Sequence, residues 1–206
     1  MATLLKKIPQ QDRSKKRLAA IIAAAEKIAV EQDIDQATTS MIAARAGVAI
    51  GSIYQFFEDR DALLEYVYIQ TLDRIVTEQQ AFAGAGFDRW QDFISENLRH
   101  FWRLAQNHPS FLIFTRWYNA TRPLKETIAP LDSPLGRFLQ QVVSGGDFDF
   151  PAERRDVILT LITASLSIGI DLAFEEKDQT KAVLIIEALI DQTITSLSPF
   201  EKAKAL

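Results

Sequence analysis

The sequence contains no cysteine and only two histidines, which limits the chemistry open to it. Without cysteine the chain can form neither disulfides nor thiolate metal sites, and a reducing cytoplasm suits it. The histidines, His100 and His108, stand eight positions apart. We expect them to be buried, exposed or at a helix end rather than bound to metal. The sequence therefore predicts no metal and no cofactor.

Signatures of catalysis, export and membrane insertion are also missing. The chain has no HExxH, GxSxG, P-loop or GxGxxG pattern, and its carboxylates are scattered. The N-terminus lacks the long apolar region of a signal peptide. Polar residues interrupt the most apolar stretches, residues 157–174 and 182–190, which favours buried helices over membrane spans. These absences argue against an enzyme and against a membrane protein, and favour a cytoplasmic protein.

Acidic residues are absent from one segment of an otherwise acidic chain. Between Ala37 and Phe57 the only charged side chain is Arg45, whereas the 206-residue chain has a net charge of −4. Residues 1–20 carry six basic side chains against one acidic, and residues 65–206 carry 14 basic against 19 acidic. A basic arm beside an acid-free segment indicates a DNA partner. Residues 1–12 fit equally well an arm on DNA and a disordered, solubilising tail.

Residues 38–57, TTSMIAARAGVAIGSIYQFF, have the pattern of two short helices joined by a tight turn. Ala43 is small, as needed where a second helix crosses close above it. Gly47 stands where the chain reverses, and glycine tolerates the positive φ expected there. Ile53 fills the angle between the helices. The pattern predicts a helix-turn-helix whose second helix, about residues 50–57, lies in the major groove of DNA.

The same spacing of alanine and glycine also occurs in plain helical hairpins. Here the segment additionally presents hydroxyl and amide groups suited to phosphates and base edges. Gln55 can read adenine through N6 and N7, and Tyr54 can donate its hydroxyl to a phosphate. The residues that we expect at DNA are Thr38, Thr39, Ser40, Arg45, Gly51, Ser52, Tyr54, Gln55 and Arg60.

The pattern A-T-T-x-x-I-A-x-x-A-G-V-x-x-G-S-I-Y-Q-x-F, followed by D-R-D-A-L-L, resembles the DNA-binding domain of the tetracycline-repressor (TetR) family of bacterial regulators. The resemblance runs from about residue 17 to residue 67. It implies an all-α fold with two domains. An N-terminal three-helix helix-turn-helix domain with a basic arm would occupy residues 1–58. A larger helical ligand-binding and dimerisation domain would occupy residues 59–206.

Three positions differ from the family's pattern. Asp33 stands where the family usually has glycine, and we expect its left-handed turn to survive because Asp tolerates that backbone better than most residues. Phe56 replaces a Tyr or His, so the polar contact of that side chain is lost. Arg60 replaces a Lys that touches a phosphate in the family, and arginine can make that contact bidentately.

Helical periodicity continues to the end of the chain. We expect helices over residues 12–31, 59–82, 88–107, from 109 onward, 135–143, 151–176 and 178–197, with Pro151 in the first turn of its helix. The last two are apolar over more than one stripe and must be covered on more than one side. A monomer core would satisfy this, but in the family these helices pair with their copies. The predicted dimer interface comprises Leu166, Ile170, Ile186, Leu189 and Ile190.

Large aromatic residues gather in the middle of the chain, where core packing and a pocket for an apolar ligand are both consistent with them. The predicted pocket residues are Phe93, Asn97, Phe101, Phe114, Trp117, Tyr118, Leu161 and Ser165. The sequence thus predicts a dimeric repressor that binds a palindromic operator and is released by a small apolar ligand. The alternative is a helical small-molecule-binding or interaction protein that does not regulate through DNA.

Overall fold

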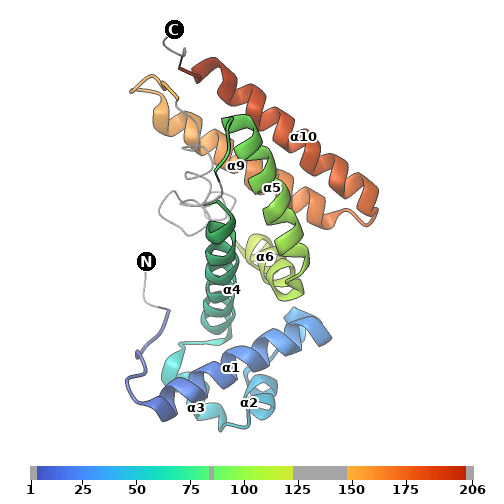
Figure 1. The fold of residues 1–206 in the computed structure, drawn as a ribbon. Coiled ribbons are helices and arrows are strands. Elements are labelled where there is room, and N and C mark those ends of the chain that lie inside the picture. The colour runs from blue at the N-terminus through green and yellow to red at the C-terminus, as the bar shows by residue number, and fades with distance from the viewer. Residues whose placement is uncertain (1–3, 84–85, 123–147, 203–206) are drawn as a thin grey trace. The chain divides into compact units, whose positions relative to one another are not determined.

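The computed structural model describes residues 4–83, 86–122 and 148–202, and these residues are almost entirely helical (Figure 1). The part of the chain that is described holds no β-strand. It holds one isolated antiparallel bridge, between Phe148 and Glu201. The predicted all-α fold is confirmed.

In chain order the elements are α1 (Asp12–Glu31), η1 (Ile34–Gln36), α2 (Thr39–Ala46), α3 (Ile50–Phe56), α4 (Arg60–Ala83), α5 (Trp90–Gln106), α6 (Pro109–Thr121), α9 (Arg155–Glu175), α10 (Gln179–Leu197) and η2 (Ser198–Phe200). The predicted helix over residues 135–143 lies outside the described residues. The placement of Pro151 in the first turn of a helix was wrong. A separate turn, in which the Arg154 N–H donates to the Pro151 carbonyl at 2.9 Å, precedes α9.

The chain divides into two compact units that interleave in sequence. One comprises residues 1–72 and 108–121, and the other comprises residues 73–107 and 122–206. The first unit therefore holds α1 to α3, the first half of α4 and α6. The sequence had suggested a simple boundary after residue 58.

The core of the first unit forms where α1 meets the helix-turn-helix. The apolar stripe of α1 is buried at Leu18, Ile21, Ala24, Ala25, Ile28 and Ala29. Ile53 and Phe57, predicted to face inward from the second helix of the motif, are fully buried. Burying one such side chain contributes roughly 1.5–3 kcal/mol. On its other side α1 packs against α6, which also contacts η1.

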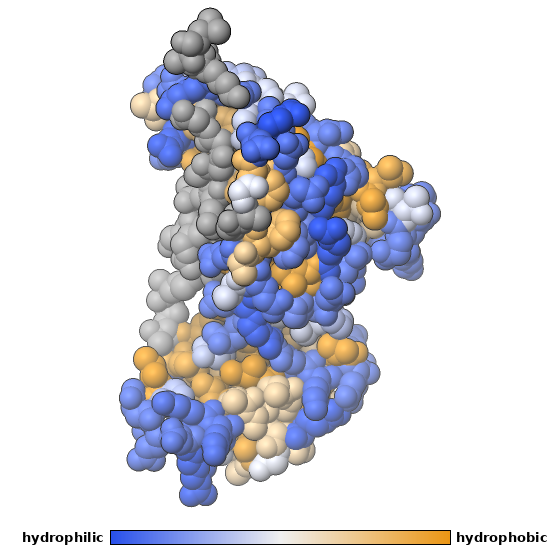
Figure 2. All heavy atoms as spheres, in the orientation of Figure 1, coloured by the Kyte–Doolittle hydropathy of each residue, from blue (hydrophilic) through white to orange (hydrophobic). Residues whose placement is uncertain are grey.

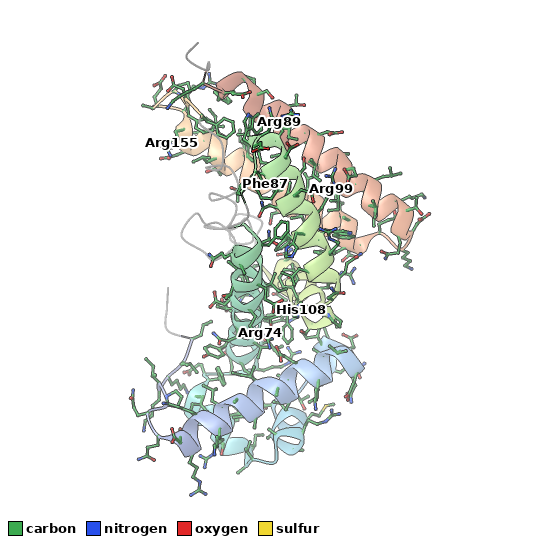
Figure 3. All side chains as sticks on the ribbon, in the orientation of Figure 1. Arg74, Phe87, Arg89, Arg99, His108 and Arg155 are labelled. Carbon is green, nitrogen blue, oxygen red and sulfur yellow. The ribbon has the colours of Figure 1, made fainter. Side chains whose placement is uncertain are left out.

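In the second unit α9 and α10 form a closely packed pair of consecutive helices (Figure 1). They pack closely at Gly169, where an added Cβ would lie 2.7 Å from a methyl group of Leu189. Arg99 ties α5 to α10, since its Nε and Nη2 donate to the two carboxylate oxygens of Glu187 at 2.8 and 2.5 Å (Figure 3). This hydrogen-bonded pair lowers the pKa of Glu187.

A chain of polar side chains lies buried between the second half of α4 and α5. Gln79 Nε2 donates to Asn97 Oδ1 at 2.9 Å, and Asn97 Nδ2 donates to the Phe93 carbonyl at 2.8 Å. His100 Nδ1 lies 2.7 Å from Gln79 Oε1, so this nitrogen carries the proton. Burial lowers the pKa of His100, whose ring stacks on Phe82. His100 is therefore a half-buried structural residue, hydrogen-bonded to the buried Gln79. The described residues contain no cluster able to hold a metal ion.

Candidate nucleic-acid interface

The turn between α2 and α3 is built by local hydrogen bonds. Thr38 caps α2, because its Oγ1 accepts from the Met41 N–H at 3.2 Å. Gly47 ends the helix with φ +66°, the left-handed conformation predicted for it. The next amide, of Val48, donates to the Ala43 carbonyl at 3.0 Å. The Val48 bond satisfies one of the last carbonyls of α2, and the left-handed Gly47 directs the chain into α3.

The exposed face of α2 and α3 consists largely of hydroxyl, amide and glycine groups, and it also exposes the aliphatic side chain of Ile50. Tyr54 and Gln55 are exposed on α3, and Thr39 and Ser52 are half-buried. The Thr39 hydroxyl lies 3.3 Å from the Tyr54 hydroxyl, so the start of α2 is linked to the middle of α3. No acidic side chain lies on residues 37–57. Such a face can donate to phosphates and to base edges with no like-charge repulsion of its own.

Gly51 lies in the first turn of α3, where its backbone conformation does not demand glycine. A Cβ at this position would meet nothing within 4 Å. Glycine inside a helix costs roughly 0.5–1 kcal/mol relative to alanine. Since no described atom of the chain lies where this Cβ would stand, the bare backbone suits close approach by an external partner.

Arg45, expected at DNA, is paired with the end of α1 instead of standing free. Its Nη2 donates to Glu31 Oε2 at 2.6 Å, and this hydrogen bond lowers the pKa of Glu31. Arg45 follows Thr39 by six residues, or about 240° around the helix. It therefore projects from a different face of α2, and its pairing joins α1 to the motif.

Arg60 also makes internal contacts. Its Nε donates to the Ala37 carbonyl at 2.7 Å, and its Nη2 donates to the Ile34 carbonyl at 2.6 Å. Its Nη1 lies 3.1 Å from Asp61 Oδ1. The guanidinium thus fixes the segment that leads into α2, a role that sequence patterns do not reveal.

The prediction of a left-handed turn at Asp33 was wrong. Asp33 has φ −74° and ψ 130°, an extended conformation, and its Oδ1 accepts from the Asp35 N–H at 3.0 Å. The carboxylate caps η1, so the chain reverses there without a positive φ. Phe56 is buried in the core of the unit, where no polar group is required.

The predicted pocket residues are divided between the two units. Phe114, Trp117 and Tyr118 belong to the first, where the ring of Tyr118 stacks on Tyr68. The other five belong to the second. Asn97 and Phe101 are buried there, while Leu161 and Ser165 line a hollow of about 360 Å³ with residues of α10.

The predicted dimer-interface residues Leu166, Ile170, Ile186, Leu189 and Ile190 are all buried within the single chain. The face that remains exposed on α9 and α10 carries other apolar residues: Val157, Leu161, Ile168, Leu172, Val183 and Leu184. Figure 2 shows apolar atoms at the surface where α10 begins. Any association through these two helices therefore uses the exposed set, because the predicted set already fills the protomer core.

The helix-turn-helix segment also resembles known proteins. The family model for bacterial regulatory proteins of the tetR family matches residues 21–67. An uncharacterized HTH-type transcriptional regulator of Haemophilus influenzae is 25% identical over 179 residues, which cover 84% of this chain and 91% of that protein.

Solved structures share the fold at low identity. A TetR-family regulator from Pectobacterium atrosepticum has a TM-score of 0.69 at 18% identity, covering 95% of this chain and 99% of that one. RolR in complex with resorcinol has a TM-score of 0.62 at 18% identity, covering 95% and 100% of the respective chains.

The motif and its exposed face define a helix-turn-helix DNA-binding protein. More narrowly, residues 21–67 carry the DNA-binding domain of the tetR family of bacterial regulatory proteins.

Proposed function

We propose that this regulator is a homodimeric repressor in the cytoplasm whose α3 reads a palindromic operator and whose second unit binds a releasing ligand. The observation that carries the DNA-reading role is the acid-free face of α2 and α3, with Gly51 on open surface. Gln55 reads a base, and Tyr54 with the hydroxyls at the start of α2 contacts phosphates. Arg45 and Arg60 hold the motif in shape instead of contacting DNA.

Dimerisation is supported by the exposed apolar face of α9 and α10. Only 33% and 28% of their most apolar stretches is buried within the chain. By length and composition each helix could also cross a membrane, but the family is one of soluble regulators. We therefore assign this face to a second copy. Two-fold symmetry then requires an operator with two inverted half-sites.

A small, largely apolar ligand is supported by the aromatic content of the chain and by RolR, a structural relative whose complex contains resorcinol. Release requires that the ligand prefer a conformation of the dimer that DNA does not. By linkage, DNA must then weaken ligand binding by the same factor. Titrating a ligand with and without operator DNA tests this, and equal affinities would contradict regulation by release.

The DNA-reading role is tested with Gln55→Ala. The protein is titrated by fluorescence anisotropy onto duplexes from upstream of its own coding region. Loss of a bidentate contact to adenine should weaken specific binding by about 1–3 kcal/mol and relax the preference at one base pair per half-site. An unchanged affinity and base preference would show that α3 does not lie in the groove as proposed.

A further inference from the structure

The residues before α1 are attached to the end of α3. The Lys6 N–H donates to the Phe56 carbonyl at 2.8 Å, and Lys6 Nζ lies 3.0 Å from Glu58 Oε2. Leu4 and Leu5 are half-buried, so the segment lies against the first unit before it enters α1 (Figure 1). We call residues 4–9 the N-terminal strap.

The strap satisfies a need of α3 that the helix cannot meet itself. The last four carbonyls of any helix have no partner within it. Helix α3 has seven residues. The Phe57 N–H donates to the Ile53 carbonyl at 2.9 Å, and the Lys6 N–H donates to the Phe56 carbonyl. A helix of two turns is unstable by itself, so its position depends on such external contacts.

The bonded carbonyl is close to the proposed base contact. Gln55 immediately precedes Phe56, on the exposed side of the same final turn. Fraying of that turn would move the amide of Gln55 and the backbone that carries it. Holding the Phe56 carbonyl therefore limits the directions in which Gln55 can reach into the groove.

We propose that the N-terminal strap positions the recognition helix, with the Lys6 amide as the positioning group, and that it thereby sets sequence specificity. The inference rests on the proposed role of α3 in reading bases. It differs from the use of a basic arm as a phosphate clamp. A phosphate clamp raises affinity for every sequence and steepens the salt dependence, whereas a positioning strap changes the ratio of specific to non-specific affinity.

The test compares Lys6→Pro with Lys6→Ala. Proline removes the backbone N–H and the ammonium group, and alanine removes only the ammonium group. Glu58→Gln removes the ion pair while leaving both groups of Lys6 in place. Each variant is titrated onto the duplex that the wild-type protein enriches from a randomised pool, and onto a scrambled duplex of the same composition.

We expect Lys6→Pro to lower the specific-to-scrambled affinity ratio by about 3- to 10-fold relative to Lys6→Ala, as loss of one hydrogen bond implies. The slopes of affinity against salt should be equal for the two variants. Lys6→Ala and Glu58→Gln should keep the wild-type ratio. Hydrogen exchange at the Phe57 amide should be faster in Lys6→Pro alone, which a phosphate clamp would not produce.

A second variant guards against misfolding of the proline substitution. A chain that begins at Gln10 lacks the strap but keeps α1, and the Lys6→Ala, Lys7→Ala double variant is its charge-matched control. The truncated chain should show the same loss of ratio relative to that control. The inference would be overturned if Lys6→Pro had the same specific-to-scrambled affinity ratio as Lys6→Ala, and the truncated chain the same ratio as the double variant. That result would leave the proposed function intact. A wild-type protein without preference for any duplex would overturn both.

Discussion

Two exposed surfaces of this protein differ in the chemistry that they present. The face of α2 and α3 shows hydroxyls, an amide, a bare glycine and one large aliphatic side chain, Ile50, with no acid. The face of α9 and α10 shows aliphatic side chains, of which Leu161 and Leu184 are 63% and 62% exposed. Neither surface resembles the mixed-charge exterior of an isolated soluble helix. Each is suited to a partner, and the chemistry indicates which one: a polyanion for the first and an apolar surface for the second.

The largest effect should come from a charge placed on the exposed apolar face of α9 and α10. Leu184→Glu puts a carboxylate on the exposed face, so the dimer should dissociate while each protomer stays folded. Ile186→Glu, two residues away, is the matched control. Ile186 is only 3% exposed, and an unpaired buried charge costs several kcal/mol, so this variant should unfold. Sedimentation and circular dichroism separate the two outcomes, and a monomeric wild type at micromolar concentration would refute the proposed interface.

Replacing Arg60 tests whether this side chain stabilises the DNA-binding unit or contacts a DNA phosphate. Arg60→Ala leaves the carbonyls of Ile34 and Ala37 without this donor, so the free energy of unfolding should fall by about 1–3 kcal/mol. Arg60→Lys should recover only part of the lost free energy of unfolding, because one ammonium group cannot reproduce the hydrogen bonds of the planar guanidinium. The salt slope of DNA binding should stay unchanged. A slope reduced by about one unit with unchanged stability would instead assign Arg60 to a phosphate.

The smallest effect is expected at Gly51. Substitution there should increase the stability of the fold but decrease the affinity for DNA. Gly51→Ala should raise the free energy of unfolding by about 0.5–1 kcal/mol, because alanine favours the helix and the added Cβ meets no atom within 4 Å. Operator affinity should nevertheless fall, because the methyl group would stand between α3 and the DNA. Thermal melts and anisotropy titrations on one preparation compare the two. Undiminished DNA affinity would place Gly51 away from the interface.

Sequence patterns predicted the helical elements well where capping and periodicity agree. The bounds of α1, the Thr38 cap and the left-handed Gly47 follow from residue types whose backbone preferences are strong. Asp33 was mispredicted because a carboxylate can cap a 3-10 turn as well as tolerate a left-handed backbone. Local preference does not decide between these two outcomes.

The site itself was less predictable than the fold that carries it. Arginine can bind a phosphate, a carboxylate or a backbone carbonyl, and only the structure shows that Arg45 and Arg60 are held by internal partners. On α9 and α10 helical periodicity showed that more than one side is apolar. It could not tell which side faces α5 and which side stays exposed. The strap was missed because a main-chain donor leaves no signal in the sequence.

The most direct test of the account is enrichment of duplexes from a fully randomised pool by the wild-type protein, followed by sequencing. The acid-free face of α2 and α3, presented twice by a symmetric dimer, predicts one enriched motif made of two inverted half-sites. The same selection with Gln55→Ala should lose the preference at one position in each half-site and keep the others. No enrichment, or an enriched single asymmetric site, would contradict the claim that this protein reads a palindromic operator through α3.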